Sequence, residues 1–252
     1  MFNFLLSVNY KVAAFLLAVL YSIGLPVQVR GKPLDGSIAV TAHSGCMDLP
    51  ANSIEAMEAG INAGADIVEF DLNYTSDGTP VLFHNTPEDG ATYVTLAEAF
   101  AFLAEHPGIL ANVDVKSTEY LEKVPVLAEE AGVTDQIFFT GVNEQMVATV
   151  REKCPGIPYY LNASVSKDDD VKALAEKTEE LGAVGINLDW TCVSPELIAA
   201  FHKKGMPVSV WTVNEAADII QMALAGADGI TTRRPNTACD VIRQASATGS
   251  GC

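Results

Sequence analysis

Residues 63–70 read AGADIVEF and residues 225–232 read AGADGITT, so one pattern occurs near both ends of the chain. The segment 181–188, LGAVGINL, resembles both. In each, a glycine of the kind that ends helices stands just before a short apolar run typical of a strand. This repeated pattern predicts repeated βα units and a parallel sheet. Asp66 and Asp228, at the starts of two strands, are assigned to stability.

Short apolar runs and helical patterns alternate from about residue 37 onward. Most runs have the length and composition of strands buried on both faces of a parallel sheet. The predicted strands are residues 38–42, 67–72, 109–115, 136–140, 157–161, 184–188, 207–212 and 229–232. The helices identified between them are residues 52–63, 143–153, 168–181, 195–204 and 215–225. Asn52 and Glu55 predict a capping box at the first helix.

Eight strands without an intervening linker predict one α/β domain, a TIM (β/α)8 barrel. A doubly wound open sheet is the alternative. The glycine-rich signature G-x-G-x-x-G of its nucleotide-binding members is missing from the sequence. We assign residues 35–245 to the barrel and residues 246–252 to a C-terminal tail.

Residues 1–34 differ in composition from the rest of the chain. They contain no acidic residue, and residues 12–29 are uncharged. Such a run suits the apolar region of a signal peptide or a short membrane anchor, with a buried first helix as the remaining alternative. We therefore expect an exported protein, secreted or membrane-anchored, with the barrel outside the cytoplasm.

Charge and cysteine content exclude some functions. The chain of 252 residues has a net charge of −17, which would repel nucleic acid, so a small-molecule partner is favoured. Cysteines 46, 154, 192, 239 and 252 show no C-x-x-C spacing, which argues against a zinc site. An exported protein could pair some of them, but an odd number leaves at least one unpaired within the chain, and the sequence does not assign a pairing.

Residues 67–84, IVEFDLNYTSDGTPVLFH, place two carboxylates in an apolar strand. Glu69 and Asp71 are two residues apart and share a face. In residues 112–116, NVDVK, Asp114 and Lys116 share a face in the same way. Because the chemistry of TIM barrels lies at the carboxyl ends of the strands, the three carboxylates are expected to meet there. Oxygen ligands favour Ca²⁺ or Mg²⁺ over zinc, whereas the acidic background of the chain is the alternative explanation.

Two of the four histidines, His43 and His84, lie on either side of this pair of carboxylates in the sequence. Histidine can give or take a proton near neutral pH, so two of them suit a reaction that needs an acid and a base. His106 and His202 have the surroundings of surface residues.

Several motifs occur in the order found in a known family. Residues 42–45 (AHSG), 49–53 (LPANS) and 64–84 resemble the opening motifs of the glycerophosphodiester phosphodiesterase family. NVDVK resembles its N-x-E-x-K strand, and residues 208–232 resemble its closing segment. The resemblance spans residues 38 to about 235. It implies a TIM barrel and metal-dependent hydrolysis of glycerophosphodiesters to glycerol 3-phosphate and an alcohol.

The resemblance also implies roles for the matching residues. His43 and His84 match the acid/base pair, and the metal ligands match Glu69, Asp71 and Asp114. Lys116 matches a lysine that faces the phosphate, and Trp211 matches an aromatic wall near the substrate.

Other positions depart from the family pattern. Ser44 stands in place of an arginine, Ala51 in place of a glutamate, and Asn85 in place of an aspartate. Asp114 is one methylene shorter than the glutamate of the family, and Arg233 replaces an aspartate. TIM barrels often bind phosphate after strands seven and eight, so Arg233 is predicted to bind phosphate in place of the lost arginine. A solvated surface arginine is the alternative.

Three functions therefore stand beside one another: an exported phosphodiesterase, a catalytically impaired relative that binds a phospho-ligand or metal, and a metal-dependent aldolase or isomerase. The third leaves the paired histidines without a role. The sequence does not fix the head group of the substrate, the choice between Ca²⁺ and Mg²⁺, or the oligomeric state.

Overall fold

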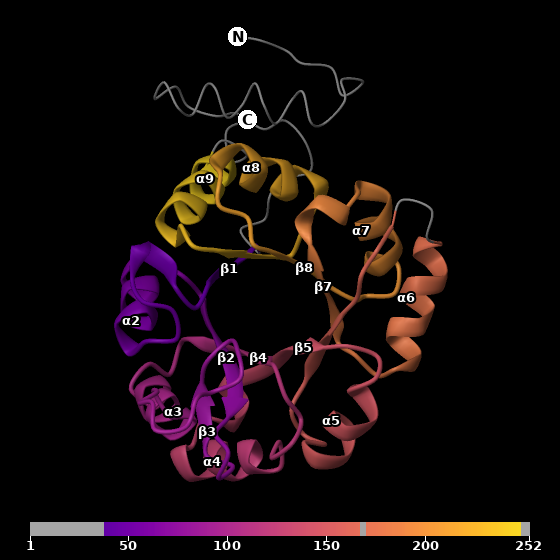
Figure 1. Cartoon of the computed structure of the whole chain (residues 1–252). Helices are drawn as coiled ribbons and strands as arrows, with labels where there is room; N and C mark the ends of the chain where they lie inside the picture. Colours follow the sequence, from indigo (N-terminus) through magenta and orange to yellow (C-terminus); the bar gives the residue numbers. More distant parts are fainter. Residues whose placement is uncertain (1–37, 167–169, 248–252) are drawn as a thin grey trace, which may run out of the picture.

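The computed structural model describes residues 38–166 and 170–247, and eight parallel strands form a barrel in this part of the chain (Figure 1). The strands are β1 (Ala39–Ala42), β2 (Ile67–Tyr74), β4 (Leu110–Val115), β5 (Ile137–Val142), β6 (Tyr159–Asn162), β7 (Gly185–Asp189), β8 (Val208–Trp211) and β9 (Gly229–Thr232). Each overlaps one of the eight predicted strands. The differences are at the ends, where burial pattern alone defines a strand poorly.

The sheet closes on itself. β1 pairs with β9 through Thr41 and Thr231, and it pairs with β2 through Thr41 and Ile67. Both pairings are parallel. β1 therefore has a neighbour on each side and joins the first strands of the sheet to the last. This closure makes the sheet a barrel and excludes the open doubly wound sheet.

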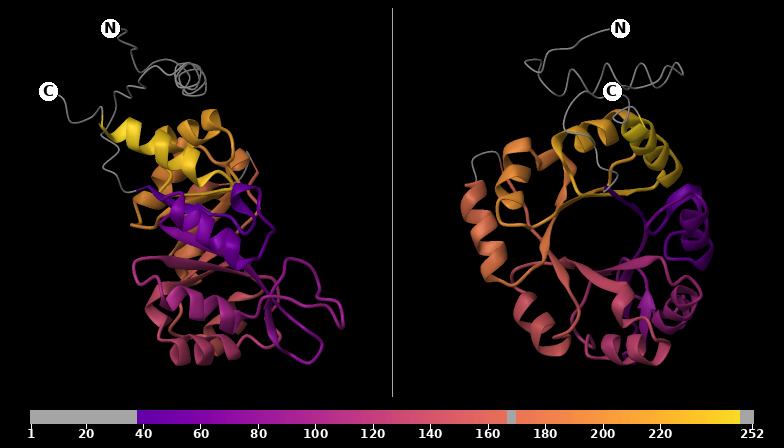
Figure 2. Two further views of the ribbon diagram at one scale, coloured as in Figure 1. Left: turned by 90° about the vertical axis from the view of Figure 1, so that its left-hand side faces the viewer. Right: turned by 180° about the vertical axis from the view of Figure 1, so that it is seen from behind.

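Helices surround the barrel, as Figure 1 and the right view of Figure 2 show. They are α2 (Ile54–Asn62), α3 (Leu96–Ala104), α4 (Lys123–Ala131), α5 (Val147–Lys153), α6 (Val171–Glu180), α7 (Pro195–His202), α8 (Ala216–Ala225) and α9 (Pro235–Ala247). Three of these, α3, α4 and α9, are absent from the helices identified in the sequence. α9 continues past residue 245, the predicted boundary between barrel and tail.

One strand was not predicted. β3 (Pro80–Leu82) pairs antiparallel with β2, through Leu72 and Leu82 and through Tyr74 and Pro80. It has only three residues and begins with proline, so it gives almost no periodic signal. The connection that contains β3 projects from one end of the barrel (Figure 2), and His84 follows β3 by two residues.

The predicted cap of the first helix is wrong by one residue. Ser53, and not Asn52, caps α2, and its Oγ accepts from the backbone N–H of Ala56 at 3.1 Å. Asn52 has a left-handed backbone, with φ of 62°, and its side chain bonds to Asp71 on β2 instead. Both residues are common N-caps, so composition could not distinguish them.

The repeated AGAD pattern at residues 63–66 and 225–228 has a structural explanation. Gly64, two residues after α2, and Gly226, directly after α8, have φ of 95° and 97°, a backbone that glycine adopts readily. The Asp66 carboxylate then accepts from the N–H of Val40 at 2.9 Å, and the Asp228 carboxylate accepts from the N–H of Val208 at 2.7 Å. Each aspartate thus joins the start of its strand to a neighbouring strand, which agrees with the stabilising role assigned from the sequence.

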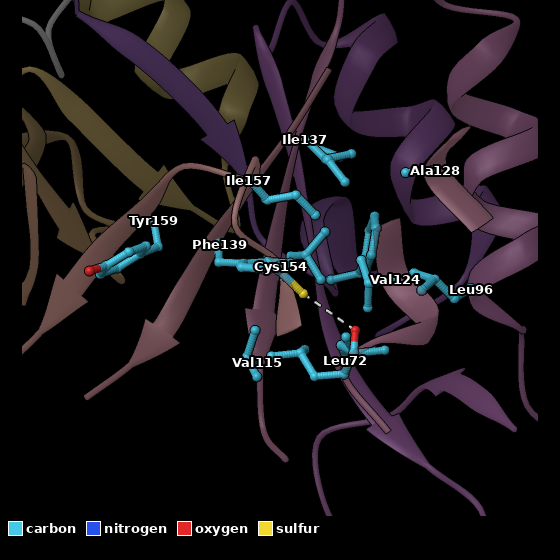
Figure 3. Packing of buried hydrophobic residues seen from close by; sticks show 14 of the residues in the cluster. Leu72, Leu96, Val115, Val124, Ala128, Ile137, Phe139, Cys154, Ile157 and Tyr159 are labelled. Atoms are coloured by element: carbon cyan, nitrogen blue, oxygen red, sulfur yellow. Dashed lines mark hydrogen bonds between the residues drawn. The ribbon is translucent and has the colours of Figure 1, made fainter. Parts of the chain in front are cut away.

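The hydrophobic core lies between the strands and the helices in two clusters. One surrounds β1 and β7 to β9, and the other surrounds β2 to β6. Figure 3 shows the second, in which the Cys154 thiol donates to the carbonyl of Leu121 at 3.4 Å. Because side chains alternate along a strand, residues between the packed ones, such as Glu69 and Asn112, point into the barrel. The four cysteines described, Cys46, Cys154, Cys192 and Cys239, are free thiols.

The predicted N-terminal signal or anchor, residues 1–34, lies outside the described residues. Among those that the structure does describe, no helix has the length and hydrophobicity needed to cross a membrane.

Candidate active site

Three carboxylates meet where β2 and β4 approach their carboxyl ends. Asp71 on β2 pairs in register with Asp114 on β4, and Glu69 lies one layer deeper on β2. One oxygen from each of the three carboxylates lies within 4.8 Å of the other two. Glu69 and Asp71 are only 5% and 4% exposed. The structure therefore brings together the three acids expected to converge.

One ammonium group lies among these carboxylates. Lys116 Nζ is 2.9 Å from Asp71 Oδ1 and 2.6 Å from Asp114 Oδ2. Burial acts to raise the pKa of Asp71, but the positive charge of Lys116 and hydrogen bonds to the carboxylate hold it below its usual value. For Glu69, burial and then the negative charges of Asp71 and Asp114 raise the pKa. A single lysine thus offsets only part of the negative charge.

The chemistry of these residues fits a divalent cation. Asp114 Oδ1 is buried and has no hydrogen-bond partner within the described part of the chain. Buried polar atoms nearly always have a hydrogen-bond partner or a bound ion, so a ligand is expected at this oxygen. A hard cation held by carboxylate oxygens would supply it and would also offset the remaining charge. Glu69, Asp71 and Asp114 are therefore the residues that can hold a metal ion.

Asn52 is a site residue that the sequence reasoning missed. Its Nδ2 donates to Asp71 Oδ2 at 2.9 Å, and its Oδ1 accepts from the backbone N–H of Asp71, also at 2.9 Å. Asn52 is 7% exposed. The two bonds fix the orientation of a candidate metal ligand, as residues behind metal ligands commonly do. Its place in LPANS, a motif of the resemblance, was the available signal.

His43 follows β1 and lies beside Glu69. Its Nδ1 is 3.2 Å from Ser44 Oγ and 4.0 Å from Glu69 Oε2. The backbone N–H of Ser44 donates to the same glutamate oxygen at 2.7 Å, so one turn positions both groups. Burial, followed by the positive charge of Arg233, lowers the pKa of His43 to about 4. His43 is therefore neutral near pH 7, where its ring can accept a proton.

His84 approaches the carboxylates from the β3 side. Its Nδ1 lies 3.0 Å from Asp71 Oδ1. The side chain is 65% exposed, so it faces the solvent at the mouth of the barrel. The two histidines thus lie against different carboxylates of β2, with His43 beside Glu69 and His84 beside Asp71.

Arg233 and Trp211 lie at the same end of the barrel, just after β9 and at the end of β8. Trp211 is 38% exposed, and Arg233 is also exposed. The backbone N–H of Arg233 donates to Asn214 Oδ1 at 2.9 Å, and its carbonyl accepts from the N–H of Met47 at 3.0 Å. Its charge acts on the pKa of His43. Both residues are therefore placed at the rim, whereas the other six predicted site residues contact one another.

Comparison with known proteins agrees with this arrangement. The model of the family described as "Glycerophosphoryl diester phosphodiesterase family" matches residues 43–100 and 86–237. A glycerophosphodiester phosphodiesterase of Caldanaerobacter subterraneus is 23% identical over 242 residues, which cover 81% of this chain and 98% of that protein. The chain belongs to the glycerophosphoryl diester phosphodiesterase family, whose members are hydrolases that act on phosphodiesters.

Solved structures share the fold. A glycerophosphodiester phosphodiesterase from Parabacteroides distasonis has a TM-score of 0.70 at 18% identity, covering 84% of this chain and 98% of its own. A phosphodiesterase from Oleispira antarctica, solved with sn-glycerol-3-phosphate, has a TM-score of 0.67 at 20% identity, covering 81% of this chain and 96% of its own.

Proposed function

We propose that this chain hydrolyses glycerophosphodiesters to glycerol 3-phosphate and an alcohol, using Ca²⁺ or Mg²⁺ held by Glu69, Asp71 and Asp114. The observation that supports this most is the arrangement of two histidines against the two buried carboxylates of β2. Their ring nitrogens lie 4.0 Å and 3.0 Å from the carboxylate oxygens. The product bound to the Oleispira antarctica phosphodiesterase is the one expected here.

Positive charge at the mouth would bind the phosphate. The cation, when bound, would polarise the phosphoryl oxygens and stabilise the charge that develops on them. Lys116 Nζ, held by Asp71 and Asp114, is placed beside the same carboxylates and can donate to a phosphoryl oxygen. Arg233 at the rim supplies a second side-chain cation, in place of the arginine that Ser44 replaces.

Proton transfer falls to the two histidines. His43 accepts the proton of a glycerol hydroxyl as that oxygen forms a bond to phosphorus. His84 protonates the oxygen of the alcohol as its bond to phosphorus breaks. Water then opens the resulting cyclic phosphate to glycerol 3-phosphate, and the histidines return to their first states. The lowered pKa of His43 keeps its ring in the neutral form that a base needs.

A second candidate function is the binding of a phospho-ligand or cation without turnover. It is favoured by Ser44, which is buried and brings no charge beside His43, and by Ala51, which brings no carboxylate. The intact set of histidines, acids and Lys116 favours catalysis instead.

An assay of product release separates the two functions. We expect the full chain to release glycerol 3-phosphate from glycerophosphocholine or glycerophosphoethanolamine in the presence of Ca²⁺ or Mg²⁺. Chelation of the cation should lower the rate by about 100-fold or more, because charge stabilisation at phosphorus is lost. Cation binding without turnover of either diester would favour the binding role.

Arg233→Ala is expected to raise KM for the diester about tenfold, because a charge-assisted hydrogen bond to phosphate is lost. Steady-state kinetics would measure this. Arg234→Ala is the matched control, since Arg234 donates to Asp48 at 2.6 Å. Its KM should change by less than about twofold, as for most surface substitutions. An unchanged KM in Arg233→Ala would show that Arg233 is a solvated surface residue.

A further inference from the structure

β5 contains a bulge beside the carboxylate of Asp114. Along β5 and β6, Phe139 pairs with Tyr159 and Val142 with Leu161, so β5 has one residue more than its neighbour over this stretch. Gly141 lies within it and has φ of 73°, a left-handed backbone. An extra residue of this kind bends the strand and frees its backbone groups from the regular ladder.

A side chain from β6 compensates for the interrupted ladder. The backbone N–H of Gly141 donates to Asn162 Oδ1 at 2.9 Å, and Nδ2 of Asn187 lies 3.5 Å from the same oxygen. Asn162 on the neighbouring strand β6 thus stabilises the bulge. Its position is fixed by side chains that point into the barrel, toward the candidate active site.

The carboxylate of Asp114 fills the space that a side chain at residue 141 would need. A Cβ on Gly141 would lie 2.1 Å from Asp114 Oδ1, and 2.7 Å and 2.9 Å from the backbone O and N of Val115. The other carboxylate oxygen of Asp114 is 2.6 Å from Lys116 Nζ. The two oxygens are joined in one rigid planar carboxylate, so any rotation that takes Oδ1 out of this space also moves Oδ2 relative to Lys116.

We propose that Gly141 is a positioning residue for the cation site: the missing side chain at the β5 bulge allows Asp114 to hold its unpartnered Oδ1 among the three carboxylates. This rests on the proposed function, in which Asp114 is a cation ligand. Gly141 does not touch the cation in this account. It acts by leaving room for a ligand, and its amide is held by Asn162.

Gly132 provides a matched control. It has the same φ of 73°, at the end of α4, and nothing lies within 4 Å of a Cβ built there. Alanine at either position therefore carries the same unfavourable backbone conformation. At residue 141 it would also meet Asp114 Oδ1 and the backbone of Val115, two contacts that the Asp114→Ala background separates.

Calorimetric titration of the full chain with Ca²⁺ and with Mg²⁺ tests the proposal. Gly141→Ala should weaken cation binding by about 10-fold to 100-fold, the range typical for residues that orient metal ligands. Gly132→Ala should leave it within about twofold. Equal affinities in the two variants would overturn the proposal. Failure of the unaltered chain to bind either cation would instead overturn the proposed cation site, so the two failures are distinguishable.

The Asp114→Ala background keeps the test decisive if Gly141→Ala does not fold. Removal of the carboxylate relieves the closest contact, so Gly141→Ala should lower Tm less in this background than in the unaltered chain. Recovery of a folded protein in the double variant would likewise support the proposal. An equal loss of Tm in both backgrounds, or a double variant that still fails to fold, would overturn it by assigning the effect to the backbone of Val115.

Discussion

Asp71→Asn is expected to lower diester hydrolysis by about 1,000-fold and cation affinity by about 100-fold. The substitution keeps the size of the side chain but removes its charge. Asp71 Oδ1 lies 2.9 Å from Lys116 Nζ and 3.0 Å from His84 Nδ1, and the group is one of the three carboxylates that converge. The substitution should therefore affect the cation site, the lysine proposed to bind phosphate and one histidine together.

Asp135→Asn is the control for this prediction. Asp135 is exposed on the short helix Thr134–Gln136, which precedes β5 and so lies at the other end of the barrel. The hydrolysis rate and cation affinity of Asp135→Asn should stay within about twofold of those of the unaltered chain. Calorimetry and product release, with circular dichroism to verify folding, would measure both variants. Undiminished cation binding in Asp71→Asn would remove Asp71 from the proposed ligands.

His43→Ala is expected to lower kcat by about 1,000-fold while cation affinity changes by no more than about threefold, because loss of a general base removes a proton-transfer step. His43→Ala should thus separate turnover from cation binding. His43 lies 4.0 Å from Glu69 Oε2 and is not among the carboxylates proposed to hold the cation. Removing it should leave those carboxylates in place.

His202→Ala provides the comparison for His43→Ala. His202 also lies against a carboxylate, with Nε2 2.8 Å from Asp228 Oδ2, but it does so at the end of α7, near the amino ends of the strands. The kcat of His202→Ala should stay within about twofold of that of the unaltered chain. A normal kcat in His43→Ala would contradict the assignment of His43 as the base.

The barrel was predictable because its strands are short apolar runs separated by helical patterns. β5 shows where this reasoning stops. Its apolar residues marked a strand, but the bulge at Gly141 depends on the register with β6, which involves residues distant in the sequence. β3 was missed for another reason, since three residues that begin with proline give no periodicity.

The candidate site divides in a similar way. Glu69 and Asp71 stand out in the sequence because two carboxylates interrupt an apolar strand. Asn52 does not, because asparagine before a helix usually indicates a cap. Its bonds to Asp71 depend on a turn with φ of 62° that no local pattern specifies. Polar residues within apolar strands could therefore be predicted from the sequence. The residues that orient them could be identified only from the three-dimensional structure.

Hydrolysis is proposed to depend on a cation held by Glu69, Asp71 and Asp114. The most direct measurement is a titration of the metal-depleted full chain with Ca²⁺ and with Mg²⁺, following cation binding and product release together. The same titration is repeated on the triple variant Glu69→Gln, Asp71→Asn and Asp114→Asn. We expect binding and product release to rise along one curve in the unaltered chain and both to be lost in the triple variant. Product release that persists in chelator, or undiminished cation binding by the triple variant, would contradict it.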